Sequence, residues 1–326
     1  MSIQNRPVRW GIIGPGRIAH RFAQDLSTIP DAALHAVASR DKARAETFAS
    51  QYGATTTYNS YEDLADDPKV DAVYIATPHS YHHQHSILCL NRKKAVLCEK
   101  PFAMNLGEVQ EMEETAKLNQ TLLMEALWTF FLPHYRKVLD LLNEGAIGSI
   151  LSVEADFGFK PEWDPGSRVF KKELGGGSLL DIGIYPIFLA LTTIGMPDDL
   201  EATGTFFRNG VDSSCTMRFG YKSGAEARLY CSFLEQTPTA AVITGDRGKL
   251  TIHPKFHAPT SFTLENNSRS ETFDFDVKTN GYSYEIIHFN HLIRRGHTES
   301  DIMTFNKSKQ LITLLDAVRE QVGLVY

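Results

Sequence analysis

The sequence predicts a two-domain α/β protein: an N-terminal Rossmann dinucleotide-binding domain, then an α/β domain with an open, mostly antiparallel sheet. The chain has 326 residues, more than one typical domain. Short apolar runs first alternate with amphipathic stretches, and after Ser149 alternating strands separated by turns take over. We therefore expect a cofactor domain at residues 1–125, and a substrate-binding and oligomerisation domain at 126–326 whose last helix is a candidate to pack back on the first.

The first domain is expected to alternate buried strands with crossover helices. Asn105 and Glu108 have the spacing of a helix N-cap and its partner. The segment Thr121–Leu132 is expected to lead the chain out of this domain. The expected strands are Val8–Ile13, Leu34–Ala38, Ala72–Ala76 and Ala95–Cys98, and the expected helices are Arg17–Leu26, Lys42–Tyr52, Ser80–Leu90 and Leu106–Leu118.

The second domain shows strand alternation instead. Apolar residues at 215, 217 and 219, and again from 225 to 233, alternate with polar ones. Turn residues lie at Asn209-Gly210, at Ser223-Gly224 and at 245–248, which predicts an antiparallel sheet. Helices are expected at Ser178–Ile194 and Lys307–Val322.

Composition excludes several classes of protein. The 33 Lys and Arg against 39 Asp and Glu give a net charge of -6, which argues against a nucleic-acid partner. The four cysteines lie in apolar runs without metal or disulfide spacing, so buried free thiols are expected. No run approaches the ~20 apolar residues of a membrane span. A cytoplasmic protein without a membrane partner is the prediction.

The first expected strand ends in a glycine loop, GIIGPGRIA at residues 11–19. Gly14 allows the tight turn, Gly16 lets the backbone approach a pyrophosphate, and the small Ala19 lets the helix pack on the strand. The helix then begins at Arg17 and Ile18, whose N–H groups and dipole favour phosphate. This pattern at the first strand–helix junction predicts a dinucleotide cofactor.

The end of the second strand favours NADP over NAD. An NAD site usually has an acidic residue here, whereas this chain has Ser39 and Arg40, with Arg44 close behind. A guanidinium binds a 2'-phosphate that a carboxylate would repel. NAD remains the alternative, with Asp41 as the acid, and solvent-exposed arginines are the plain structural interpretation.

Three further motifs belong together: Ala76-Thr77-Pro78-His79 followed by His82, Cys98-Glu99-Lys100-Pro101, and GGGSLLDIGIYP at 175–186. With them the sequence resembles the glucose-fructose oxidoreductase, inositol dehydrogenase and MocA (Gfo/Idh/MocA) family over nearly its whole length. Met124-Glu-Ala-Leu-Trp-Thr129 looks most like the branch of dimeric dihydrodiol dehydrogenases and NADP-linked D-xylose dehydrogenases. That branch often has Arg where this chain has Phe130.

The resemblance implies hydride transfer between nicotinamide and a carbinol or carbonyl carbon of a sugar, polyol or trans-dihydrodiol. Such chemistry needs a proton acceptor or donor. Tyr185 is the first assignment, with Lys100 as the partner that favours its phenolate, and the reverse assignment is the alternative. Asp181 lies one helical turn before Tyr185 and is expected on the same face, with a helix-entry carboxylate as the alternative. The resemblance further implies catalytic His82, cofactor-binding Thr77, Pro78, His79, Glu99 and Lys100, and substrate-binding Lys100, Trp128, Phe157, Arg168, Asp181 and Tyr185.

Four histidines lie close together in sequence, at 79, 82, 83 and 85. Their spacing does not place three ligands on one helix face, so no metal is expected. His83 and His85 are expected on the helix surface.

Two other functions remain open at this point. The substrate is alternatively an inositol or another sugar derivative, and the chain is alternatively a dinucleotide-binding regulator without turnover. An open sheet exposes a broad face, so a homodimer or a dimer of dimers is expected.

Overall fold

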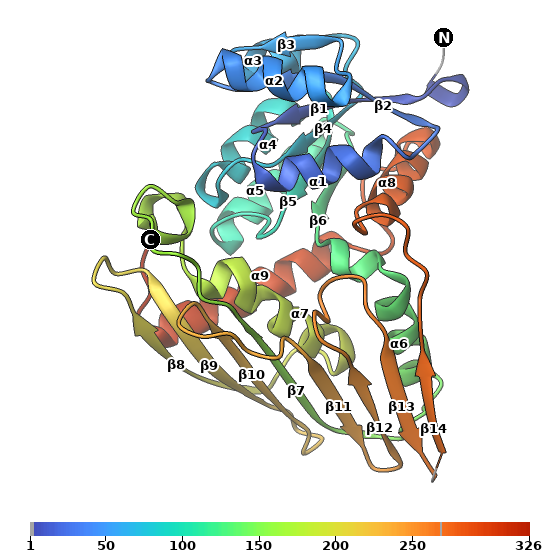
Figure 1. Cartoon of the computed structure of the whole chain (residues 1–326), viewed down its shortest axis with the longest axis vertical. Helices are drawn as coiled ribbons and strands as arrows, with labels where there is room; N and C mark the ends of the chain where they lie inside the picture. Colours follow the sequence, from blue (N-terminus) through green and yellow to red (C-terminus); the bar gives the residue numbers. More distant parts are fainter. Residues whose placement is uncertain (1–2, 268) are drawn as a thin grey trace. The chain divides into compact units, whose positions relative to one another are not determined.

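The computed structural model describes residues 3–267 and 269–326 and divides the chain into two compact units (Figure 1). The first unit comprises Met1–Phe130 and Val277–Lys309, and the second comprises Phe131–Asp276 and Gln310–Tyr326. The chain therefore returns to its first unit after completing most of the second, and crosses again within the last helix.

A six-stranded parallel sheet organises the first unit, with strand order β3-β2-β1-β4-β5-β6. This is the doubly wound dinucleotide-binding order, which reverses between β1 and β4. The predicted Rossmann domain is confirmed. The strands are β1 Val8–Ile13, β2 Ala32–Ala38, β3 Thr56–Tyr58, β4 Ala72–Ile75, β5 Ala95–Glu99 and β6 Leu123–Ala126, and the helices are α1 Arg17–Leu26, α2 Lys42–Tyr52, α3 Tyr61–Asp66, α4 His82–Leu90, α5 Leu106–Leu118 and α8 Ser283–Arg295.

Residues 121–132 lead the chain into the second unit, as the sequence suggested, but they first form a strand that was not expected. They contain β6, which pairs with β5 as the sixth strand and is fully buried. The short run was missed because a buried carboxylate, Glu125, interrupts its apolar character. The short elements β3 and α3 also escaped notice, since neither is long enough to show periodicity.

Helix α8 joins the first unit through an acidic residue of α1. Asp25 is buried, and its carboxylate accepts hydrogen bonds from the backbone N–H groups of Asn280, Gly281, Tyr282 and Ser283 at 2.7–3.1 Å. These are orphan donors at the start of a helix. The side chain of Asp25 thus anchors the beginning of α8 from more than 250 residues away.

An eight-stranded sheet organises the second unit, with strand order β14-β13-β12-β11-β7-β10-β9-β8. Of the strand pairs that the described residues form in this sheet, only β7–β10 is parallel, so the predicted mostly antiparallel sheet is confirmed. The strands are β7 Ile150–Gly158, β8 Asp199–Phe206, β9 Asp212–Gly220, β10 Glu226–Ser232, β11 Ala241–Gly245, β12 Gly248–Ile252, β13 Phe262–Asn266 and β14 Arg269–Phe273, and the helices are α6 Pro133–Asn143, α7 Ile184–Thr193 and α9 Phe305–Val322.

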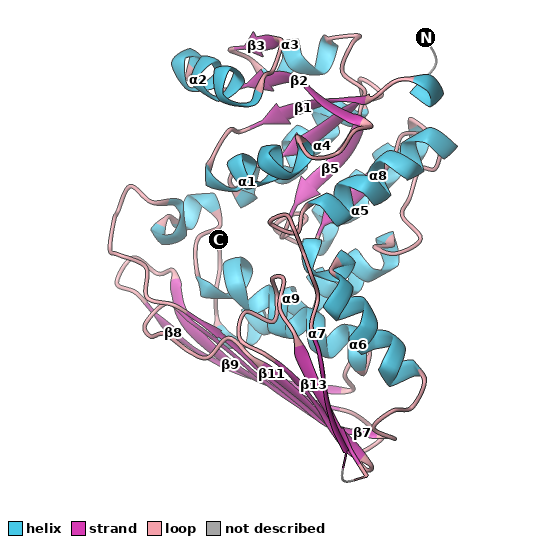
Figure 2. Cartoon of the chain, turned by 45° about the vertical axis from the view of Figure 1, so that its right-hand side comes forward, coloured by secondary structure: helices cyan, strands magenta, loops and turns pink. Residues whose placement is uncertain are grey.

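The sheet of the second unit buries one face against helices. Figure 2 shows α6 and α7 on one side of it, and α7 contacts β7 and β10. In β9, Cys215, Met217 and Phe219 are buried while Thr216 and Arg218 are exposed, as the alternation predicted. All four cysteines are free and buried, also as predicted.

Among the described residues one helical stretch, Lys172–Thr193, is long and apolar enough to cross a membrane, although the sequence suggested no such stretch. Its most apolar part is 94% buried inside the folded chain. Burial of this kind is ordinary for the central helix of a core.

Candidate functional site

The glycine turn of the first unit follows β1. Gly14 has a φ of +84°, and a Cβ there would lie 2.9 Å from Thr77 Cγ2. The backbone conformation and the packing against Thr77 therefore both require a glycine, even without a ligand. Gly16 differs, because a Cβ there would meet no described heavy atom nearer than Gly14 O at 4.0 Å. The missing side chain of Gly16 therefore leaves open space beside the backbone, as a bound pyrophosphate needs.

The helix that follows this turn begins without a side-chain cap. Helices α2, α3 and α5 are capped by Asp41, Ser60 and Asn105, whereas the N-cap of α1 is Gly16, for which the described residues offer no side-chain acceptor. The first N–H groups of α1, including those of Arg17 and Ile18, have no acceptor within their own helix. A helix start of this kind favours an anionic ligand such as a phosphate.

The end of β2 holds the residues expected to choose the cofactor. Ser39 is buried, and its Oγ accepts a hydrogen bond from Asp41 N at 3.2 Å. The carboxylate of Asp41 accepts one from Arg44 N, also at 3.2 Å, and so caps α2. Arg40 and Arg44 are exposed. Asp41 is therefore engaged in the helix start, and Arg40 presents its charge at the surface.

The histidine segment forms a 3-10 turn, His79–Tyr81, that continues into α4. His82 has no exposed surface, and its Nδ1 and Nε2 lie 2.7 Å from Pro101 O and 2.8 Å from Thr77 O. The ring thus joins the loop after β4 to the loop after β5. His79 is buried with its ring 5.7 Å from that of His82.

The surface position expected for His85 is wrong. His85 is buried between Tyr61 and Tyr81, because α4 turns this side of its first turn toward α3. His83 is partly exposed, with Nε2 2.9 Å from Glu111 Oε2. Among the described residues no three His, Cys, Asp or Glu side chains form a group that could hold a metal.

The motif after β5 is held by two carboxylates. Glu99 accepts a hydrogen bond from the buried Tyr74 hydroxyl through Oε1, and one from Lys100 N at 3.2 Å through Oε2. Burial, and then the charge of Glu99, raises the pKa of Tyr74. Glu125, which the sequence analysis did not identify, accepts a hydrogen bond from Phe102 N at 3.1 Å. Burial raises the pKa of Glu125 to about 7.

Asp181 and Tyr185 lie in the second unit, and both are buried. Asp181 lies in a π-helical segment, Leu179–Gly183, that leads into α7, and Arg168 donates a hydrogen bond to it at 2.8 Å. The change from π to α falls just before Pro186, whose ring nitrogen has no N–H to donate to the helix.

Aromatic rings surround Tyr185. The rings of Phe157 and His257 lie 5.7 and 4.9 Å from its own, centroid to centroid, and 4.2 Å from each other. The sequence suggested Phe157 but not His257, which lies in a loop after β12 without any motif. Trp128, in the first unit, is buried and stacks on Tyr282 at 4.6 Å, so packing uses much of its surface.

Among the glycines before Asp181, Gly177 is required by the packing of the second unit. A Cβ on Gly177 would lie 1.8 Å from Asp212 Oδ1, and Gly177 has a φ of +120°. Asp212 is fully buried and accepts hydrogen bonds from Ser178 Oγ and Leu179 N, both at 2.7 Å. Asp212 thus holds the start of the π segment, a role without a sequence signal.

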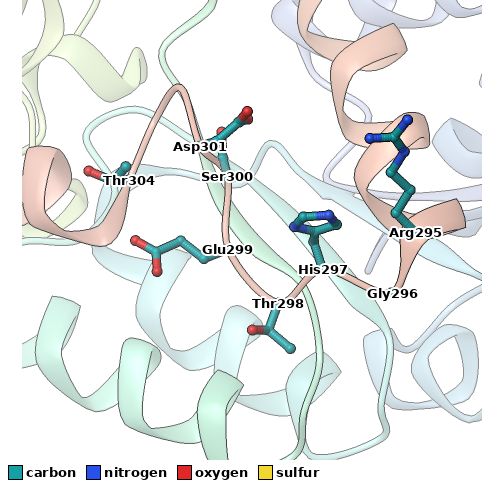
Figure 3. Close-up of a pocket in the computed structure, with 8 residues that line it drawn as sticks. All are labelled: Arg295, Gly296, His297, Thr298, Glu299, Ser300, Asp301 and Thr304. Carbon is teal, nitrogen blue, oxygen red and sulfur yellow. The ribbon is translucent and has the colours of Figure 1, made fainter.

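An open hollow of about 560 Å³ lies along the loop between α8 and α9 (Figure 3). None of the site residues expected from the sequence lines it. Its polar side chains serve the loop itself: Glu299 accepts a hydrogen bond from Phe305 N at 2.6 Å, and Ser300 Oγ accepts one from Met303 N at 2.9 Å. The hollow is therefore a feature of the loop rather than the candidate site.

Comparison with known proteins finds family models that match two parts of the chain. A model described as an oxidoreductase family with an NAD-binding Rossmann fold matches residues 8–127, and a GFO/IDH/MocA C-terminal domain model matches 135–251. Trans-1,2-dihydrobenzene-1,2-diol dehydrogenases from Danio rerio and Xenopus tropicalis are 37% and 35% identical, each over 98% of this chain and 98% and 99% of their own. A 3-ketoreductase from Actinomadura kijaniata, solved with NADP and TDP-benzene, is 29% identical with a TM-score of 0.88, covering 97% of this chain and 98% of its own.

Proposed function

The chain belongs to the GFO/IDH/MocA family of oxidoreductases, and from this premise we propose its substrate class, its cofactor preference and the residues that act. It is an NAD(P)-dependent oxidoreductase that transfers a hydride between nicotinamide and a carbinol or carbonyl carbon of a sugar, polyol or diol. The observation that most strongly supports this function is the 35–37% identity to dihydrodiol dehydrogenases over 98% of the chain.

NADP is the preferred cofactor in this proposal. When bound, the cofactor supplies or accepts the hydride. The open space at Gly16 and the uncapped start of α1 suit its pyrophosphate, with Arg17 and Ile18 offering N–H groups. Arg40 supports the preference, because it can pair with a 2'-phosphate. Thr77, Pro78, His79 and Glu99 belong to the same cofactor site in this proposal, together with Ser39 and Arg44.

Tyr185 is the proposed proton donor and acceptor, and Lys100 supplies the positive charge that favours its phenolate. The reverse assignment is the alternative that the variants below test. Asp181 binds the substrate through its carboxylate, which Arg168 orients. His82 acts as a positioning residue, since its ring nitrogens lie against two backbone carbonyl oxygens.

Trans-dihydrodiols and pyranose sugars are the proposed substrates. Phe157 beside Tyr185 supplies an apolar ring for either, and Trp128 and Lys100 complete the proposed substrate contacts. Inositols and other sugar derivatives are the competing class of substrate, and a dinucleotide-binding regulator without turnover is the competing function.

A cytoplasmic homodimer, or a dimer of dimers, completes the proposal. The free cysteines suit a reducing compartment, and the helix-free face of the second sheet suits a subunit contact (Figure 2). Light scattering during size-exclusion chromatography tests the assembly, and a monomer would contradict it.

The deciding experiment combines cofactor titration with a substrate panel. The purified chain is titrated with NADPH and NADH by fluorescence and then assayed by absorbance with dihydrodiols, aldoses and inositols. We expect tighter binding of NADPH and turnover of a dihydrodiol or an aldose. Turnover of inositols alone would move the substrate class, and tighter NADH binding would overturn the cofactor preference.

A further inference from the structure

The phenol of Tyr326 reaches the glycine segment that precedes Asp181. Its hydroxyl donates a hydrogen bond to Gly176 O at 2.7 Å, across 150 residues of sequence. Burial, and then the nearby charge of Asp212, raises the pKa of Tyr326, so this hydroxyl keeps its proton at physiological pH. Tyr326 belongs to the same unit as Asp181 and has no role in the function proposed above.

The end of α9 holds Tyr326 in this place. Gly323 follows the helix in a left-handed conformation, with a φ of +72°. Leu324 is buried and donates its backbone N–H to Arg319 O at 2.9 Å, which closes the helix with a turn. Arg319 Cζ lies 5.5 Å from the centre of the Tyr326 ring, within range of a cation–π attraction. The ring is therefore held by its own helix end as well as by its hydroxyl.

Gly176 and Gly177 are also bonded to the turn that carries Arg168. Gly176 N donates to Lys171 O at 2.9 Å, and Gly177 N donates to Val169 O at 3.0 Å. A Cβ on Gly176 would lie 2.7 Å from Arg168 O, so this contact leaves no room for a side chain. The guanidinium of the same Arg168 donates to the carboxylate that is proposed to bind the substrate.

The segment that carries Asp181 depends on such anchors. It forms a π-helical turn, Leu179–Gly183, a rare conformation that is frequent at functional sites. An uncommon backbone conformation persists only where its surroundings determine it. Asp212 holds the start of the turn through two hydrogen bonds. The hydroxyl of Tyr326 lies on the same side, because a Cβ on Gly177 would meet both Asp212 Oδ1, at 1.8 Å, and this hydroxyl, at 3.3 Å.

We propose that Tyr326 is a positioning residue for substrate binding, which fixes the pair of Arg168 and Asp181 through the backbone of Gly176. The inference rests on the proposed function and deepens it, since Asp181 is the proposed substrate-binding carboxylate. A carboxylate that is already held in one orientation loses less entropy when a substrate hydroxyl binds to it. Tyr326 therefore raises the affinity for substrate through Asp181 rather than by a contact of its own.

The test compares two variants that each remove one phenol hydroxyl from the second unit. Tyr326→Phe keeps the ring and removes the bond to the glycine segment. The matched control is Tyr221→Phe, because the Tyr221 hydroxyl also donates to a glycine carbonyl, Gly195 O, at 3.4 Å. Both variants are made in the unaltered chain and in an Asp181→Asn background, and circular dichroism melting confirms that each is folded.

Binding is measured without turnover. Trans-1,2-dihydrobenzene-1,2-diol, or D-xylose if only the aldose is a substrate, is titrated by calorimetry into the NADPH complex, in which the cofactor is already reduced and cannot accept a hydride. NADPH affinity is measured by fluorescence. Amide hydrogen exchange of residues 175–183 is followed in the free protein by mass spectrometry.

We expect Tyr326→Phe to weaken substrate binding about tenfold and to speed exchange of residues 175–183 by a similar factor, while NADPH affinity changes less than twofold. Tyr221→Phe should leave all three within twofold. In the Asp181→Asn background, Tyr326→Phe should weaken substrate less than twofold, because Tyr326 acts through Asp181.

Equal losses for substrate and NADPH, an undiminished effect in the Asp181→Asn background, or no change in exchange would overturn the inference. Failure of the unaltered chain to bind NADPH and either substrate would instead overturn the proposed function. The exchange rates alone would then decide whether Tyr326 holds the segment.

Discussion

The two units present their candidate site residues in different ways. In the first unit these residues follow the ends of parallel strands, where Gly14, Gly16 and Lys100 stand in short motifs. In the second, Asp181 and Tyr185 lie on a buried helical segment, and the rings around Tyr185 come from strands and loops distant in sequence. The turn at Gly14 is thus specified by neighbouring residues, whereas the surroundings of Tyr185 depend on tertiary packing. The proposed cofactor contacts lie in the first unit, and the proposed proton donor and acceptor, Tyr185, lies in the second.

The largest expected effect is that of a substitution in the second unit. Tyr185→Phe removes the proposed proton-transferring hydroxyl but keeps the ring that packs against Phe157 and His257. We expect turnover to fall by about 10² to 10⁴-fold, the usual contribution of general acid–base catalysis.

Steady-state kinetics and NADPH titration on the same preparation measure it. A loss of NADPH affinity as large as the loss of turnover would show that Tyr185 also contributes to cofactor binding. If Lys100→Met abolishes turnover while Tyr185→Phe barely changes it, the reverse assignment holds.

A pH experiment tests the titration of Glu125, whose carboxylate accepts a hydrogen bond from Phe102 N, two residues after Lys100. The folded pKa of Glu125, about 7, exceeds the ordinary value of 4.5, so the folded chain binds more protons between these values. Stability is therefore lost as the pH rises from about 4.5 to 7, by roughly 3 kcal/mol at 1.36 kcal/mol per unit.

Glu125→Gln should recover much of that loss at pH 8, because the amide oxygen can still accept from Phe102 N. Urea unfolding from pH 5 to 8 measures the difference between the two proteins. Parallel curves for variant and parent would contradict the expected titration.

Gly14 and Gly16 allow a comparison within the first unit, between a glycine that the fold requires and one that the proposed ligand requires. Gly14→Ala should lower the unfolding free energy by about 2 kcal/mol, because its φ of +84° and its contact with Thr77 disfavour a side chain. Gly16→Ala should leave stability within about 0.5 kcal/mol yet weaken NADPH severalfold, since its Cβ fills only the proposed phosphate space. Thermal melts and NADPH titration separate the two. A stable Gly14→Ala or a normally binding Gly16→Ala would refute the assignment.

The smallest expected effect concerns Ser39. Its hydroxyl accepts from Asp41 N at the start of α2, so Ser39→Ala should cost about 1 kcal/mol of stability. Because Ser39 belongs to the proposed cofactor site, the same variant should also weaken NADPH, but by less than Arg40→Ala does. An unchanged NADPH affinity would remove Ser39 from that site.

The strongest sequence predictions concern features that neighbours in the chain specify. Helices α1, α2 and α5 begin and end as expected, and the turn at Gly14 and the alternation in β9 are also confirmed. Each depends on a short run of residues, through periodicity or a required backbone conformation.

Other features could not be predicted because they join distant parts of the chain. Asp25 holds the start of α8, Asp212 holds the π segment, and His257 lies against Tyr185. No local pattern marks such partners, since any buried acid or loop histidine looks alike in sequence.

By itself, the sequence determined the two sheets, the glycine turn and the family, because short-range spacing and binary patterning encode them. Only the tertiary structure decided that His85 is buried between Tyr61 and Tyr81 and that α8 belongs to the first unit. The physical reason is the same in both cases. A buried polar group must find its partner wherever the folded chain provides one, and that place is set by the packing of whole elements.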